Sequence, residues 1–170
     1  MGGAFALWVP FSGLTLSLAA LAFGFDQTHK WWMLYIYDIA QRQPVQALPF
    51  LDLVLAWNRG VSYGWFASHG ALGQVVLIAV AVVVSAWLWR WGSQARRRLT
   101  AAALGLIIGG ALANALDRAE HGAVADFFQL HWGGWSWYIF NIADVAVVAG
   151  VALLVYDSFQ DKAPRPAEGP

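Results

Sequence analysis

The stretch that decides the fold runs from Ala71 to Trp91 and reads ALGQVVLIAVAVVVSAWLWRW. Its single charged residue is Arg90, and tryptophans stand at positions 87, 89 and 91 at the same end. About 20 consecutive apolar residues in a helix are enough to cross a bilayer. Three further apolar stretches occupy about residues 8–25, 99–116 and 139–156. The pattern predicts an all-α membrane protein with four transmembrane helices.

The composition agrees with this fold class. Of the 170 residues, 59% are apolar and 12% are charged, and the mean hydropathy is +0.54. A soluble domain is usually about 25% charged, so this chain lacks the polar residues that would cover a water-facing surface. The net charge of zero gives no reason to expect a nucleic acid partner. The absence of cysteine excludes disulfides and a cysteine nucleophile. We predict a single integral membrane domain over residues 1–170.

Basic residues predict which side of the membrane each connection faces. Four arginines lie at or near the junction of the second and third stretches: Arg90, Arg96, Arg97 and Arg98. Positively charged connections favour the cytoplasmic side. Both termini are therefore expected in the cytoplasm, in agreement with Lys162 and Arg165 in the tail. The two longer connections, about residues 26–70 and 117–138, are then extracytoplasmic.

The first outer connection is too long and too aromatic for a plain loop. Residues 30–40 (KWWMLYIYDIA) suit a segment that lies flat on the membrane surface. From about residue 45 to residue 66, β-branched and aromatic residues are mixed with turn signals at 58–60 and at Gly64. We therefore expect a small β-rich and interfacial element over about residues 30–66, between the first and second helices.

Two aspartates carry the strongest functional signal. Asp126 and Asp144 lie 18 residues apart at the outer edge of the fourth apolar stretch. A charged side chain at the centre of a membrane helix costs roughly 3 kcal/mol, so an acid in such a place is expected to have a use. Two acids held close together can share one proton and activate water.

Other polar residues fall on the same side of the predicted membrane. Asn114 precedes Asp117 by three residues and Arg118 by four, so all three can share one face at the outer end of the third helix. Asn141 lies three residues before Asp144, one turn away on the fourth helix. Asp126, expected on the short connection between these helices, can reach the same place. The spacing permits a convergent site at the outer surface.

The residues alone leave structural alternatives open. Asp144 could pair with Arg118 as an ionic staple between helices, and Asp117 could pair with Arg118 locally at the end of a helix. Asp26 and Lys30, four residues apart, could form an exposed pair on a helix surface.

Functional alternatives are open as well. His121 and His131 near the acids would allow a metal site, although the chain has no metal-binding spacing such as HExxH. A small transporter could use Asp144, Asn141 and Arg118 as a relay, but it would need ionisable groups along a path across the membrane. A purely structural subunit would tolerate replacement of both aspartates.

Four blocks of the sequence resemble those of the bacterial lipoprotein signal peptidase (signal peptidase II) family, in the family's order and over nearly the whole chain. They are Asp26-Gln27-Thr28-His29-Lys30, Asn58-Arg-Gly60-Val-Ser-Tyr63-Gly64, the stretch Gly109 to Arg118 followed by Gly122-Ala-Val-Ala-Asp126-Phe127, and Phe140-Asn141-Ile-Ala-Asp144. The chain departs from the family pattern at Tyr63, where Phe is usual, at His29, where Ser or Thr is usual, and before Phe140, where a Trp-Pro-x-Phe run is common.

The resemblance implies an aspartyl endopeptidase of the bacterial inner membrane with its site at the extracytoplasmic face. Such an enzyme removes the signal peptide of a prolipoprotein on the amino side of a lipobox cysteine that already carries diacylglycerol. By position, Asp126 and Asp144 are the catalytic pair. The resemblance gives supporting positions at Asn58, Gly60, Asn114, Arg118 and Asn141, and we expect structural roles for Asp26, Lys30 and Asp117. No metal or organic cofactor is expected, and membrane lipids and globomycin-type inhibitors are further expected partners.

Overall fold

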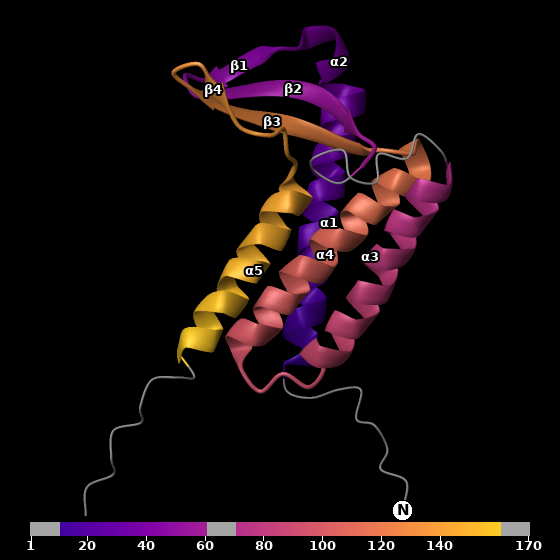
Figure 1. Ribbon diagram of the computed structural model, residues 1–170, viewed down its shortest axis with the longest axis vertical. Helices are drawn as coiled ribbons and strands as arrows, with labels where there is room; N and C mark the ends of the chain where they lie inside the picture. The colour runs from indigo at the N-terminus through magenta and orange to yellow at the C-terminus, as the bar shows by residue number, and fades with distance from the viewer. Residues whose placement is uncertain (1–10, 61–70, 161–170) are drawn as a thin grey trace, which may run out of the picture.

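The computed structural model describes residues 11–60 and 71–160. This part contains four long helices: α1 (Ser12–Trp31), α3 (Ala71–Gly92), α4 (Arg98–His121) and α5 (Ile142–Gln160). A four-stranded sheet covers one end of the helices (Figure 1). Its strands are β1 (Val45–Leu48), β2 (Leu51–Asn58), β3 (Val124–Trp132) and β4 (Trp135–Ser136). A π-helix, η1 (Trp32–Ile36), and the one-turn helix α2 (Ile39–Arg42) connect α1 to β1.

Helix α4 is the centre of the bundle, because α1, α3 and α5 all pack against it. Glycines make two of these contacts close. A Cβ atom on Gly105 would lie 2.6 Å from the backbone oxygen of Thr15 on α1, and one on Gly150 of α5 would lie 2.6 Å from the backbone oxygen of Ala103. Small residues allow helices to approach closely in lipid, where packing rather than hydrophobic burial holds them together. Helices α1 and α5 therefore each lie closely against α4.

Three of the described helices, α3, α4 and α5, are long and apolar enough to cross a membrane. The predicted stretch 71–91 agrees with α3 to within one residue. Helix α4 continues five residues beyond the predicted end at 116, to His121. The next residue, Gly122, has a φ of 67°, the left-handed conformation that commonly ends a helix. Helix α5 begins three residues after the predicted start at 139, because Phe140 pairs with β3.

The prediction that the first helix ends at about residue 25 is wrong. Helix α1 runs through Asp26 as far as Trp31, and its predicted start at residue 8 lies outside the described residues. The helix continues because the carboxylate is not exposed to water at its end. The Asp26 side chain is fully buried and pairs with Lys30 on the next turn of α1.

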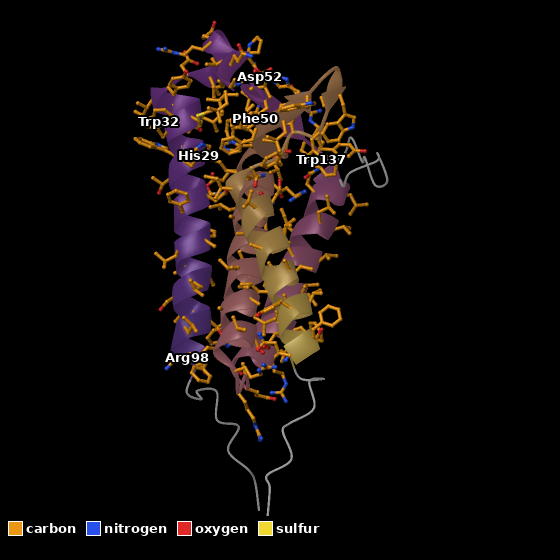
Figure 2. The ribbon with its side chains drawn as sticks, turned by 90° about the vertical axis from the view of Figure 1, so that its left-hand side faces the viewer. His29, Trp32, Phe50, Asp52, Arg98 and Trp137 are labelled. Carbon is orange, nitrogen blue, oxygen red and sulfur yellow. The ribbon has the colours of Figure 1, made fainter. Side chains whose placement is uncertain are left out.

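The interfacial segment predicted for residues 30–40 is instead a continuation of α1 through η1 to α2. Met33 and Ile39 in this segment are buried and pack in one cluster with Ala125 and Phe127 of β3. Its exposed aromatic side chains include Trp32, labelled at the sheet end of α1 in Figure 2. The segment thus supports the sheet rather than lying flat.

The small sheet expected after residue 45 is present, but it is built from both of the connections predicted to be extracytoplasmic. Its order is β1-β2-β3-β4, and all neighbouring strands are antiparallel. The connection at 117–138, in which no strand was predicted, supplies β3 and β4. Asp126 therefore lies on a strand, not on a loop. A single sequence does not reveal such a pairing easily, since β2 and β3 are separated by α3 and α4.

An ion pair joins α4 and α5 at the end of the bundle away from the sheet, near Arg98 in Figure 2. Arg97 Nη1 lies 3.2 Å from Asp157 Oδ1, and the Thr100 hydroxyl donates a hydrogen bond to Asp157 Oδ2 at 2.6 Å. This pair lies at the other end of the bundle from the sheet.

Candidate active site

Backbone hydrogen bonds tie the start of α5 to strand β3. The N–H groups of Phe127 and Phe128 both donate to the carbonyl oxygen of Phe140, at 3.0 and 2.9 Å. The N–H of Phe140 donates back to the carbonyl oxygen of Phe128 at 3.1 Å. Phe127 is fully buried, which fixes this part of the strand. The first turn of α5 is therefore held beside the part of β3 that carries Asp126.

Asn141 bridges the two aspartates. Its Nδ2 donates to Asp126 Oδ1 at 2.6 Å, and its backbone N–H donates to Asp144 Oδ2 at 3.2 Å. The N–H of Asp144 donates in turn to Asn141 Oδ1 at 2.9 Å. This exchange has the form of a capping box, so the hydrogen bonds that begin α5 also orient Asp144. Both Asn141 and Asp126 are buried, at 0% and 2% exposure.

Asn58 orients Asp126 from the neighbouring strand. In the antiparallel pairing of β2 and β3, Asn58 lies opposite Val124 and Ala56 opposite Asp126. Asn58 and Asp126 are thus diagonal neighbours on one face, and Asn58 Nδ2 donates to Asp126 Oδ2 at 3.2 Å. The N–H of Gly60 donates to Asn58 Oδ1 at 3.1 Å. Gly60 therefore reaches the aspartates only through Asn58.

Helix α4 contributes Asn114 and Arg118. Asn114 Nδ2 donates to Asp144 Oδ1 at 2.9 Å, and Asn114 Oδ1 accepts from Asn141 Nδ2 at 3.2 Å. Arg118 Nη1 donates to the backbone oxygen of Asn114 at 3.0 Å. Its positive charge interacts with the charges of Asp126 and Asp144. Within the described residues no ion pair links Arg118 to Asp144, so the structure does not contain the ionic staple that the sequence left open as an alternative.

Asp26 and Lys30 do not form the exposed pair that remained open from the sequence. Their side chains are 0% and 3% exposed, and Lys30 Nζ lies 2.7 Å from Asp26 Oδ2. Lys30 Nζ also lies 2.8 Å from Asp117 Oδ2. Asp117 thus pairs with a cation of α1 rather than with its neighbour Arg118. The close crossing of α1 and α4 brings these charges together and excludes water from them.

Gln27 is a member of this cluster that the sequence reasoning did not select. Its Nε2 donates to Asp117 Oδ1 at 2.8 Å and to the backbone oxygen of Ala113 at 3.2 Å. Its position three residues before Lys30, on the same helix face, could have indicated this role from the sequence.

His29, where the chain departs from the family pattern, has a packing role, since its ring stacks on that of Phe128 at a centroid distance of 5.2 Å. His29 lies where α1 meets the sheet in Figure 2.

The two histidines considered as metal ligands have other partners. His121 Nε2 lies 3.8 Å from Glu120 Oε2, and its ring packs edge-on against Trp57. His131 Nε2 lies 3.3 Å from Asp52 Oδ2.

Four residues named in the sequence analysis lie outside the described residues. They are Tyr63 and Gly64 of the block that begins at Asn58, and Lys162 and Arg165 of the tail.

Burial raises the pKa of Asp126 to about 6. The negative charge of Asp144 contributes to this rise in pKa, whereas the hydrogen bonds from Asn141 and Asn58 and the charge of Lys30 oppose it. The effect of Asp144 shows that its carboxylate lies close enough to influence the ionisation of Asp126. A carboxyl group with such a pKa can hold a proton in mildly acidic or neutral surroundings and release it again.

We expect Asp126→Asn to stabilise the folded protein at neutral pH by up to about 3 kcal/mol. The pKa of about 6 in the folded state exceeds the ordinary value of 3.8, so the folded protein binds this proton more tightly than the unfolded chain. The stability that the group contributes is complete below about pH 4 and is lost as the pH rises through about 6. Asparagine resembles the protonated acid and avoids this loss.

Thermal unfolding in detergent, followed by tryptophan fluorescence, measures this effect. Asp126→Asn should melt at a higher temperature than the wild type at about pH 7.5, and the difference should shrink at about pH 4. Asp38→Asn, which changes an exposed aspartate, is the control and should melt like the wild type. Equal melting of Asp126→Asn and the wild type at both pH values would contradict the expectation.

Comparison with known proteins decides the family. The sequence matches the family model described as signal peptidase (SPase) II over residues 18–160. The chain belongs to the signal peptidase II family. The family match covers α4, α5, the whole sheet and most of α1, and so includes every residue of the site described above.

Individual members of the signal peptidase II family are similar to this chain over most of its length. It is 52% identical over 154 residues to a lipoprotein signal peptidase of Methylorubrum extorquens (strain PA1), covering 91% of this chain and 88% of that protein. It is 49% identical over 150 residues to one of Rhodopseudomonas palustris (strain ATCC BAA-98 / CGA009), covering 86% and 90%. A solved structure described as a bacterial membrane enzyme has a TM-score of 0.77 at 23% identity, covering 93% of this chain and 94% of that one. This likeness shows a shared membrane enzyme fold.

Proposed function

We propose that the protein is an aspartyl endopeptidase that removes the signal peptide of diacylglyceryl-modified prolipoproteins, cutting before the lipidated cysteine. Its relatives in the family are named lipoprotein signal peptidases, and prolipoproteins are therefore its substrates. The observation that supports the aspartyl mechanism best is the bridge from Asn141 to both Asp126 and Asp144. Two carboxylates held by one amide can share a proton and activate water.

We propose four transmembrane helices, α1 with α3, α4 and α5, in one integral membrane domain over residues 1–170. The arginines at the junction of α3 and α4, with Arg97 and Arg98 among them, favour the cytoplasm for that end and for both termini. The dyad of Asp126 and Asp144 then faces the extracytoplasmic side of the bacterial inner membrane. The interiors of the four helices carry no ionisable residues between this end and the junction, which favours a one-sided site over a transport path.

The proposed reaction begins with one proton shared by the dyad. Asp126 holds this proton, consistent with its raised pKa, and Asp144 is the carboxylate. Asp144 accepts a proton from water as the water oxygen attacks the scissile carbonyl carbon. Asp126 donates a hydrogen bond to the developing oxyanion and then gives its proton to the leaving amine as the peptide bond breaks.

Supporting residues keep the dyad in this arrangement. Asn58 and Asn141 donate to Asp126, and Asn114 donates to Asp144, so each acid has a fixed direction before substrate binds. Arg118 adds positive charge beside the oxyanion that develops. The singly protonated dyad is lost as the pH rises through about 6 in the free enzyme, so kcat/KM should fall on the alkaline side.

The lipid of the substrate remains in the bilayer beside the helices. Burial of acyl chains contributes about 0.8 kcal/mol per CH₂ group, so a diacylglyceryl precursor is concentrated in the membrane where an unmodified one is not. We also propose that globomycin-type inhibitors block the same site, and that membrane lipids surround the helices.

The test is cleavage of a prolipoprotein by the purified protein in detergent or bilayers. We expect the diacylglyceryl-modified precursor to be cut at least about 10²-fold faster than the same precursor without lipid. Mass spectrometry should find the lipidated cysteine at the new amino terminus, and a metal chelator should not change the rate. Cleavage at another bond, or no cleavage of the modified precursor, would refute the proposal.

A further inference from the structure

For the peptidase proposed above, we propose that Lys30 is a positioning residue of the dyad: its ammonium group fixes the side-chain amide of Asn114 so that the NH₂ group points at Asp144. The sequence predicts only a structural role for Lys30. Its contacts reach further. Lys30 Nζ donates to Asn114 Oδ1 at 3.1 Å, and Asn114 Nδ2 donates to Asp144 Oδ1 at 2.9 Å.

The ammonium group has three N–H bonds and no acceptor. Its three partners are Asp26 Oδ2 at 2.7 Å, Asp117 Oδ2 at 2.8 Å and Asn114 Oδ1 at 3.1 Å. Each N–H bond thus has one acceptor. With a side chain only 3% exposed, Lys30 is largely shielded from bulk water. The two carboxylates hold the charge in place, and its third N–H bond is directed at the amide of Asn114.

This contact allows only one orientation of the Asn114 amide. Asn114 Oδ1 accepts from both Lys30 Nζ and Asn141 Nδ2. If the amide were reversed, its NH₂ group would face two donors and its oxygen would face the Asp144 carboxylate. An unpaired buried polar group costs about 1–3 kcal/mol, so the reversed amide is strongly disfavoured. Lys30, together with Asn141, therefore directs the NH₂ group of Asn114 at Asp144 Oδ1.

The same cluster holds the backbone beside each acid of the dyad. Asp26 Oδ1 accepts the N–H of Ala143, directly before Asp144, at 2.8 Å. Asp117 Oδ2 accepts the N–H of Ala125, directly before Asp126, at 3.1 Å. Lys30 therefore sits at the junction of two supports, one to each aspartate. A purely structural ion cluster would need neither these connections nor the contact to Asn114.

Lys30→Met removes the donors and keeps a similar length of side chain. We expect kcat to fall about 10²-fold, as for a misplaced catalytic group, while KM changes little because Lys30 acts on the aspartates through Asn114. The alkaline limb of the kcat/KM profile should move to higher pH. The charged groups that act on Asp126 are Asp144, Lys30 and Arg118, and loss of the Lys30 charge lets its pKa rise.

The matched control is Arg97→Met, which removes another ion pair, between Arg97 and Asp157, at the far end of the bundle. It should lower the melting temperature but leave kcat and the pH profile unchanged. Since Lys30→Met leaves two buried carboxylates without a cation, Lys30→Met/Asp117→Asn is a second variant with fewer unpaired charges. It is compared with Asp117→Asn alone and should show the same loss of kcat and the same shift of the alkaline limb.

A double-mutant cycle separates positioning from stability. If Lys30 acts through Asn114, then Lys30→Met should cause little further loss of kcat in an Asn114→Ala background. Additive losses, or a folded Lys30 variant with wild-type kcat and pH profile, would overturn the inference. In that case the proposed peptidase function would still stand if the wild type cleaved the precursor and Asp126→Asn did not. A wild type that cleaves nothing refutes the peptidase, and this role of Lys30 with it.

Discussion

Asp126→Asn and Asp144→Asn are each expected to reduce kcat by about 10³-fold or more. Asparagine has nearly the size of aspartate but can neither accept the proton from water nor give one to the leaving amine. Because one proton serves both acids, losing either should be about as harmful as losing both. The measurement is the rate of cleavage of a diacylglyceryl-modified precursor by each purified variant.

Asp52→Asn is the matched control for this prediction. Asp52 lies on strand β2 of the same sheet, but its partner is His131 and not a member of the dyad. This variant should cleave at close to the wild-type rate. Wild-type activity in Asp126→Asn or Asp144→Asn, with folding verified by thermal unfolding, would remove that residue from the mechanism.

Gly110→Ala is expected to reduce kcat by about 10²-fold although Gly110 carries no functional group. A Cβ atom there would collide with the backbone oxygen of Ala143 and lie 2.9 Å from Val147 Cγ2. Helix α5 must then move away from α4, and Asp144 moves away from Asn114. Overpacking of this kind typically costs about 1–3 kcal/mol, so the melting temperature should fall as well. Cleavage rate and thermal unfolding are measured on the same preparation.

Gly24→Ala provides the comparison. A Cβ atom on Gly24 of α1 would meet no atom within 4 Å, so this variant tests the same change of residue without a collision. It should keep the wild-type kcat and melting temperature or gain slightly in stability, since alanine favours helix. If Gly110→Ala behaved like Gly24→Ala, the close crossing would not be what holds Asp144 in place.

The helices were predicted well because their signal is local. The stretch that became α3 is apolar throughout, and a bilayer needs about 20 such residues whatever their neighbours are. The first helix was predicted too short for the same reason. In the sequence, Asp26 is a charged residue directly after an apolar stretch, which suggests the end of a membrane helix. Helix α1 continues because Asp26 is paired with the buried Lys30, which also pairs with Asp117 of α4.

The site was predicted in part. The sequence pointed to Asp126, Asp144, Asn114 and Asn141 at one depth, since helical spacing relates residues three and four apart. It did not show that Asp126 lies on a strand, because the pairing of β2 with β3 joins segments far apart in the chain. It also did not reveal the part played by Gln27.

By itself, the amino-acid sequence determined the membrane class, the approximate helices and the family, all of which depend on composition and local order. The tertiary structure alone decided which polar groups meet. Helix α4 crosses α1 and α5 closely enough to bury Lys30 between two carboxylates and to set Asn114 between Lys30 and Asp144. Such contacts depend on distances of about 3 Å between groups remote in sequence, and only the packed backbone sets those distances.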